Sequence, residues 1–199
     1  MDETMNKPKI VVLAGSTRKG SIHRKLAPLA VEALTAAGLD ATFADLRDYP
    51  MPLYEGDLEA TDGMPPAAKA LKELARTADA FVIASPEYNG SYPAVLKNAI
   101  DWISRPEPGE NHLQVFAGKL AAIVSASPGP GGGRRVLRQL RELLTMMRVT
   151  VIPQDLSIPR AAEAFATDGS LARSEDLDGL HSLAAALASE LARKLEHAA

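Results

Sequence analysis

The chain has 199 residues, of which 46% are hydrophobic and 24% are charged, a composition typical of a globular domain with a substantial core. Its formal net charge of -3 provides no broad positive field that would attract nucleic acid or an anionic membrane. Because the sequence contains no cysteine, disulfides, thiolate nucleophiles and cysteine-ligated zinc or iron–sulfur sites are excluded. We therefore expect a single domain spanning residues 1–199.

The chain begins with MDETMNKPK, a segment rich in charged residues that lacks the apolar core of a secretory signal peptide. No apolar run further along approaches the length of a membrane span. These features favour a cytoplasmic protein with neither a membrane nor a nucleic acid as its partner.

Apolar runs alternate with helical patterns along the rest of the chain. Strands are predicted at residues 9–14, 41–46, 80–85, 120–127 and 148–153. Helices are predicted at residues 21–37, 65–78, 93–104, 132–147 and 176–196. Such alternation predicts an α/β protein with a parallel sheet and helices on both faces. The number of strands favours the flavodoxin-like three-layer sandwich, with strand order 2-1-3-4-5 and ligands beyond the carboxyl ends of the strands.

Two long stretches, 47–64 and 104–117, show no regular pattern and are expected to be surface excursions. The first begins at the carboxyl end of a predicted strand, next to the expected ligand edge. Its residues Tyr54 and Glu55 either shape access to the site or form ordinary loop surface.

The first strand runs into the loop GSTRKGS, residues 15–21, at the start of a predicted helix. The gap between its glycines is that of a P-loop, but Ser21 and Ile22 stand where a P-loop has its lysine and its magnesium-binding hydroxyl. Ser16, Thr17 and Arg18 add further polar side chains to this loop. Hydroxyls, an arginine and a helix N-terminus suit the three free oxygens of a terminal phosphate. A serine N-cap beside a solvated basic helix face would explain the same residues.

Two further loops follow predicted strands at the same edge. In SPEYNGS, residues 85–91, the pair Asn89-Gly90 is a strong turn signal, and Tyr88 could provide an aromatic wall. In SASPGPGGG, residues 125–133, the glycines permit close approach of backbone to a bulky ligand, or they form a flexible linkage.

Three strings in these regions, AGSTRKGSIHRKLA, SPEYNGSYPAVLKNAIDW and GKLAAIVSASPGPGGGRRVLRQLRELL, resemble the NADPH-dependent FMN reductase family. Its members include quinone, azo-dye and chromate reductases. The resemblance extends over nearly the whole chain, and it implies a flavodoxin-like fold that holds FMN without a covalent bond.

The resemblance also implies roles for individual residues. The FMN phosphate would be held by Ser16, Arg18 and Ser21, with His23 as a further donor. His23 stands where the family commonly has asparagine, and an imidazole can also donate there. The flavin ring and ribityl chain would be lined by Pro86, Glu87, Tyr88, Asn89 and Gly90 on one side and by Ser125, Ser127 and Gly129 on the other.

A homodimer or homotetramer is also implied by the family. The helical residues Lys97, Asn98, Asp101 and Trp102 would pack against the partner subunit or, alternatively, within their own chain.

The expected activity is that of an oxidoreductase in which FMN carries the chemistry and NAD(P)H is the co-substrate. Electrons would pass by a ping-pong mechanism to a small acceptor: a quinone, an azo compound, a metal oxyanion or free flavin. No catalytic side chain is expected, because FMN carries the chemistry. No metal site is expected, because the four histidines are scattered and show no metal-ligand spacing. The alternatives are a flavodoxin-like electron-transfer or sensory flavoprotein without NAD(P)H turnover, and a nucleotide-binding regulatory domain.

Overall fold

The computed structural model describes residues 7–198. Most of the charged N-terminal segment, residues 1–6, lies outside the described residues. The five strands are β1 (Lys9–Ala14), β2 (Asp40–Ala44), β3 (Ala80–Ala84), β4 (Leu120–Ala126) and β5 (Thr150–Ile158). They form one parallel sheet in the order β2-β1-β3-β4-β5, which confirms the predicted topology.

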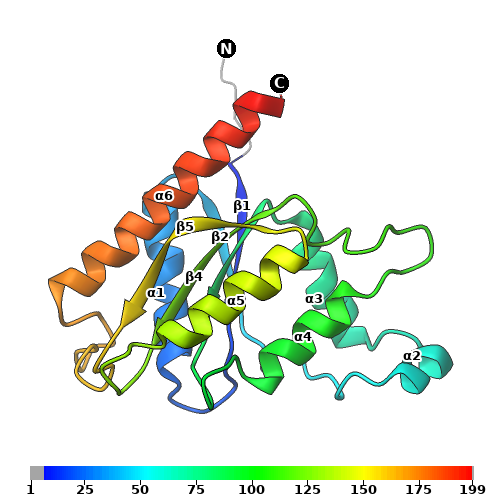
Figure 1. The fold of residues 1–199 in the computed structure, drawn as a ribbon, viewed down its shortest axis with the longest axis horizontal. Coiled ribbons are helices and arrows are strands. Elements are labelled where there is room, and N and C mark those ends of the chain that lie inside the picture. Colours follow the sequence, from blue (N-terminus) through cyan, green and yellow to red (C-terminus); the bar gives the residue numbers. More distant parts are fainter. Residues whose placement is uncertain (1–6, 199) are drawn as a thin grey trace.

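The helices cover both faces of this sheet (Figure 1). They are α1 (Ile22–Ala36), α2 (Gly56–Asp62), α3 (Pro66–Thr77), α4 (Ala94–Ser104), α5 (Arg134–Met146) and α6 (Ser174–Ala198). Alternate strand residues point to opposite faces. Val12, Val82 and Val124 therefore pack under α1 and α6, whereas Val11, Phe81 and Ile123 pack under α3, α4 and α5.

Strand β5 differs from its prediction, which ended the strand at residue 153. The strand begins at Thr150 and continues to Ile158. A register shift against β4, between Ala121 and Ile123, accommodates the extra residues around Pro153. Because Pro153 lies on the edge strand, its missing N–H breaks no pairing with a further strand, and β5 can extend beyond it.

The stretch 47–64 was predicted to be irregular throughout, which is wrong because it contains α2. The Glu55 carboxylate caps this helix and accepts from the N–H groups of Asp57 and Leu58, each at 2.8 Å. Glycine and aspartate at the start of α2 are weak helix formers, so local propensity gives little sign of a helix here. The other stretch, 104–117, contains turns after the end of α4.

Because the sheet is parallel, the carboxyl ends of its strands lie at one edge, which is the lower edge in Figure 1. Backbone hydrogen bonds continue the sheet pairing into the loops: Gly15 N–H donates to Ala84 O at 2.8 Å, and Ser85 N–H donates to Val124 O at 2.9 Å. The Ser127 N–H donates to Ile158 O at 3.0 Å. This edge therefore brings together the three loops that the sequence marks as functional.

Between residues 7 and 198, none of the helices combines the length and the apolar character that a membrane crossing requires.

Candidate functional site

Three loops form the candidate site, and we call them the first loop (15–21), the second loop (85–91) and the third loop (127–133). They follow β1, β3 and β4, which are neighbours in the sheet. The chain connection reverses direction at β1, and ligands of doubly wound sheets bind in the crevice that such a reversal creates.

The first loop presents donors that its own helix does not use. Ser21 occupies the N-cap position of α1, but within the described chain its hydroxyl makes no capping hydrogen bond, and the first turn has no acidic residue. Ser16 and Ser21 are buried, and the Ser16 hydroxyl accepts from the Arg18 N–H at a long 3.4 Å. The free N–H groups at a helix start carry a partial positive charge. The structure therefore favours an anion-binding site over a simple serine N-cap at the start of α1.

His23 lies in the first turn of α1 and reaches the end of β4. Its ring is 3% exposed, and its Nε2 accepts from the Ala126 N–H at 3.1 Å. Burial, together with the nearby Arg18 guanidinium, lowers the pKa of His23 to about 4. The imidazole is therefore neutral near pH 7 and joins the start of α1 to the start of the third loop.

The second loop forms the tight turn that Asn89-Gly90 predicts. Tyr88 and Ser91 exchange backbone hydrogen bonds of 2.9 and 3.0 Å. Asn89 and Gly90 have φ values of 52° and 80°, as both central residues of a type I′ turn require. The Tyr88 ring is 51% exposed and is available to a flat ligand.

Glu87 and Pro86 have structural contacts within the protein. The Glu87 Oε2 accepts from the N–H groups of Arg135 and Val136, at 3.1 and 3.3 Å, and so caps α5. Pro86 is buried, and its carbonyl accepts from the Ser85 hydroxyl at 3.0 Å. Glu87 therefore connects the second loop to the helix that follows the third loop.

The third loop packs closely on the strand ends beneath it. Ser125 is fully buried, and its hydroxyl donates to Ser85 O at 2.7 Å. Gly133 has φ 84°, and a Cβ there would lie 1.9 Å from the Ser125 Oγ. A Cβ on Gly132 would lie 2.3 Å from the Ser157 Oγ. These glycines thus serve close packing of the loop on its own protein, which neither sequence interpretation anticipated.

Ser127 and Gly129 lie at the start of the third loop and are partly exposed. The Gly129 N–H donates to the Ser127 hydroxyl at 3.1 Å. Of the residues predicted on this side of the ligand, these two remain accessible, whereas Ser125 is enclosed.

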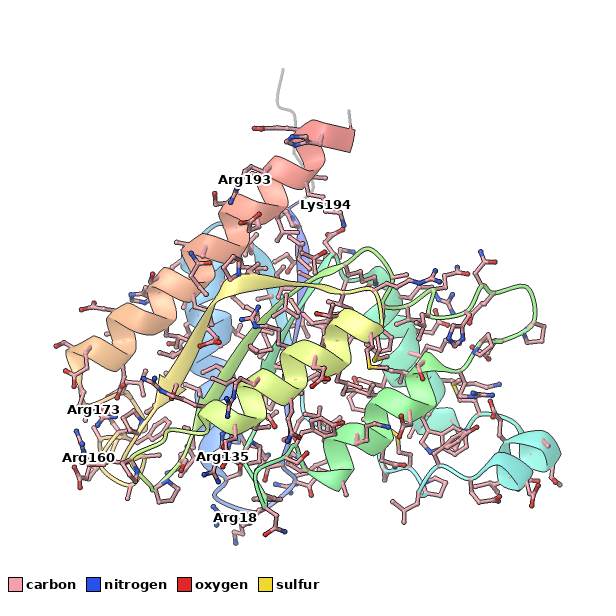
Figure 2. All side chains as sticks on the ribbon, viewed as in Figure 1. Arg18, Arg135, Arg160, Arg173, Arg193 and Lys194 are labelled. Carbon is pink, nitrogen blue, oxygen red and sulfur yellow. The ribbon has the colours of Figure 1, made fainter. Side chains whose placement is uncertain are left out.

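Exposed arginines border the same edge, as Figure 2 shows for Arg18, Arg135 and Arg160. Among residues 7–198, Arg18 and Arg135 have no ion-pair partner, and Arg160 has only Glu163 at 3.9 Å. The sequence analysis missed Arg135 and Arg160. Their position could have indicated them, since Arg135 lies in the first turn of the helix that follows the third loop and Arg160 lies two residues after the end of β5. The rim formed by these three arginines favours anionic ligands.

Four residues of α4 were expected to pack either against a partner subunit or within their own chain. Two of them, Asn98 and Trp102, contact the 47–64 stretch of the same chain. Asn98 Nδ2 and Trp102 Nε1 donate to Pro52 O at 2.9 and 2.8 Å, and Asn98 Oδ1 accepts from the Tyr54 N–H. Trp102 is fully buried. Lys97 and Asp101 pair with each other at 2.6 Å on the helix surface.

A family model described as NADPH-dependent FMN reductase matches residues 8–163. An NAD(P)H:quinone oxidoreductase of Solanum tuberosum is 38% identical over 192 residues, covering 94% of each chain. An NAD(P)H-dependent FMN reductase of Pseudomonas aeruginosa is 39% identical over 164 residues, covering 82% of this chain and 84% of the relative.

Among solved structures, the flavoenzyme NAD(P)H:(acceptor) oxidoreductase FerB of Paracoccus denitrificans is similar, with a TM-score of 0.79 and 30% identity over 94% of this chain and 98% of that one. A flavodoxin of Pseudomonas aeruginosa, at 21% identity and a TM-score of 0.55, shares the fold. The chain thus belongs to the NADPH-dependent FMN reductase family, whose enzymes use FMN together with NAD(P)H.

Proposed function

We propose that this protein is an NAD(P)H-dependent reductase that holds FMN at the three loops and passes electrons to a quinone. The observation that carries the proposal is the start of α1, where Ser16 and Ser21 are buried and, within the described residues, the first turn has neither a side-chain cap nor an acidic residue. Relatives named as quinone oxidoreductases support the choice of acceptor. FMN, when bound, supplies the redox chemistry.

The residues present fit both the phosphate and the ring of such a cofactor. Ser16, Arg18 and Ser21 would hold the phosphate, because hydroxyls, a guanidinium and a helix N-terminus all favour a dianion. Tyr88, with the Asn89-Gly90 turn, would line one side of the ring, and Ser127 and Gly129 would line the other. Ser125 and the Glu87 Oε2 would act indirectly, since both are engaged in holding the loops together.

NAD(P)H carries a pyrophosphate, and NADPH carries a further phosphate, so the arginine rim would favour its approach. We propose a ping-pong order in which the oxidised nucleotide leaves before the acceptor enters. Azo compounds, metal oxyanions and free flavin are further candidate acceptors.

The decisive experiment is a visible spectrum of the pure protein after FMN addition, followed by anaerobic addition of NADPH and then NADH. We expect saturable FMN binding, bleaching by the nucleotide, and steady NADPH oxidation once a quinone is present. Parallel lines in double-reciprocal plots would support the ping-pong order. A protein that binds FMN but is not reduced would instead be a flavodoxin-like carrier, and one that binds no FMN would contradict the proposal.

We also propose that residues 1–199 form one flavin-binding domain that assembles as a homodimer or homotetramer. An open groove of about 720 Å³ between α5 and the edge strand β5 is a candidate for such a contact, and its lining is mixed: Arg134, Leu137, Arg138, Asp155, Leu156 and Ser157. Exposed Leu53 and Met146, each 75% accessible, support further contacts. Light scattering coupled to gel filtration would give the mass, and a monomer at micromolar concentration would contradict the assembly.

A further inference from the structure

The hydrogen bond between His23 and Ala126 connects two parts of the site that are 103 residues apart in sequence. It joins the first turn of α1, beside the first loop, to the last residue of β4, directly before the third loop. Both residues are about 3% exposed. Without the imidazole, the Ala126 N–H would be a buried donor with no acceptor, and such groups are costly in folded proteins.

The two ring nitrogens of His23 have different roles in this geometry. Because Nε2 accepts a hydrogen bond, the proton of the neutral ring is on Nδ1. Within residues 7–198, no fully enclosed side-chain nitrogen or oxygen lacks a hydrogen-bond partner. Since Nδ1 has no such partner in this part of the chain, it reaches solvent, and it could donate to a ligand.

We propose that His23 is a positioning residue for the flavin ring and acts through Nε2 rather than as a phosphate ligand through Nδ1. By holding the Ala126 N–H, it fixes the start of the third loop. The Ser127 N–H bond to Ile158 O and the Ala161 N–H bond to Ser127 O, each 3.0 Å, hold the same loop from the other side. The inference rests on the proposed function, because it assigns His23 to the ring side of the same flavin site.

Two substitutions of His23 distinguish the role of Nε2 from that of Nδ1. A glutamine amide reaches about as far as Nε2 and can accept from Ala126, whereas an asparagine amide reaches only as far as Nδ1. His23→Gln therefore retains the connection to the third loop, and His23→Asn retains a donor near the position of Nδ1.

Two ligands, FMN and riboflavin, distinguish an effect on phosphate binding from an effect on ring binding. Riboflavin has the ring and ribityl chain of FMN but lacks the phosphate, so a lost phosphate contact weakens FMN alone. A displaced third loop weakens both ligands. Ser21→Ala, at a proposed phosphate contact, is the opposite control and should weaken FMN only.

The experiment is a fluorescence titration of wild type, His23→Asn and His23→Gln with FMN and with riboflavin. We expect His23→Asn to weaken both ligands by a similar factor of about tenfold, as loss of one buried hydrogen bond implies, and His23→Gln to stay within about threefold of wild type. Hydrogen exchange of the Ala126 N–H should accelerate in His23→Asn and not in His23→Gln.

Loss of FMN affinity alone in either variant would overturn the inference, as would unchanged affinities in His23→Asn or a His23→Gln variant as weak as His23→Asn. Exchange at Ala126 that is the same in all three proteins would also overturn it. A wild-type protein that binds neither ligand would contradict the proposed function itself. Because exchange at Ala126 is measured without ligand, the contribution of His23 to loop position is tested even then.

Discussion

The edge formed by the three loops and the region where 47–64 and 104–117 pack on α3 and α4 are both largely irregular, but they use their polar groups differently. At the loop edge, Ser21 leaves its helix without a side-chain cap, and within residues 7–198 the guanidinium groups of Arg18 and Arg135 form no ion pair. In the other region, which we call the anchored region, the polar side chains bind one another.

Lys72 is central to the anchored region. Its side chain is 1% exposed, and its Nζ donates to Arg105 O at 2.6 Å and to the Glu110 carboxylate at 2.5 Å. Arg76 also pairs with Glu110. Burial alone would raise the pKa of Glu110, but hydrogen bonds from Lys72, the Glu107 N–H and Arg76 lower it to about 2.

A second cluster holds 47–64 in the same region. The Tyr54 hydroxyl and the Arg105 Nε donate to the two oxygens of Glu59, each at 2.9 Å. Tyr54 also packs edge-on against Trp102, with ring centroids 5.1 Å apart. The comparison teaches that irregular sequence serves two purposes here: one region satisfies its own polar groups, whereas the other keeps donors available for a ligand.

Lys72→Met tests the anchored region with the largest expected effect. It removes the Lys72 ammonium from the enclosed Glu110 carboxylate, which keeps Arg76 and the Glu107 N–H, so the free energy of unfolding should fall by about 3 kcal/mol. Urea denaturation measures the change, and flavin affinity of the folded protein should remain that of wild type. Lys69→Met is the control, since its side chain is 53% exposed and the loss should stay below about 0.5 kcal/mol. Equal losses in both variants would show that burial of Lys72 contributes nothing.

The two regions should also respond to acid over different pH ranges. The pKa of His23 is about 4 in the folded chain and 6.5 when unperturbed. Between pH 6.5 and pH 4, His23 is therefore protonated in the unfolded chain but neutral in the folded chain. The free energy of unfolding falls by up to about 3 kcal/mol as the pH is lowered over this range. Glu110, whose pKa is lowered from 4.5 to about 2, contributes stability that is lost only as the pH falls through that lower range.

The measurement is urea denaturation of flavin-free protein from pH 7 to pH 4, for wild type and for His23→Gln. The variant has no titrating ring, so its stability should decline less over this interval. Two parallel curves would show that His23 titrates normally.

Gly133→Ala tests the close packing at the loop edge. Because a Cβ would lie 1.9 Å from the Ser125 Oγ, at a positive φ, the loop must shift, at a cost of about 2 kcal/mol. Flavin affinity should fall together with stability, since Ser127 and Gly129 belong to the same loop. Gly131→Ala is the matched control: it has no atom within 4 Å of its added Cβ and should be nearly neutral. A Gly133→Ala protein with wild-type melting and flavin binding would contradict the packing argument.

Asn98→Ala has the smallest expected effect. It removes the hydrogen bonds to Pro52 O and the Tyr54 N–H, and it should cost about 1 kcal/mol and speed hydrogen exchange at Tyr54. Lys97→Ala, on the adjacent surface position, should leave that exchange rate unchanged. If both variants exchange at the wild-type rate, Asn98 does not hold the segment in place.

Much of the fold followed from local sequence pattern. Continuous apolar runs such as 80–84 indicate strands buried on both faces, and the helical periods between them require parallel connections. The order of the strands and the edge at which the loops meet follow from these elements. The Asn89-Gly90 turn was predictable for a similar reason, since its geometry depends on adjacent residues.

Other features depended on partners distant in sequence. The extension of β5 beyond Pro153 depends on a shift against β4, and the packing of Gly133 depends on the Ser125 hydroxyl beneath it. No local pattern carries such contacts, because they arise only when separate elements are packed together.

The sequence by itself determined the α/β architecture, the edge at which the three candidate loops meet and the family, because periodicity, turn residues and motif strings are local properties. The tertiary structure alone decided that Glu87 caps α5 and that the Ser125 hydroxyl supports the second loop. It also decided that His23 accepts from Ala126. The physical reason is that a hydrogen bond between distant residues depends on the position and reach of each side chain in the packed molecule.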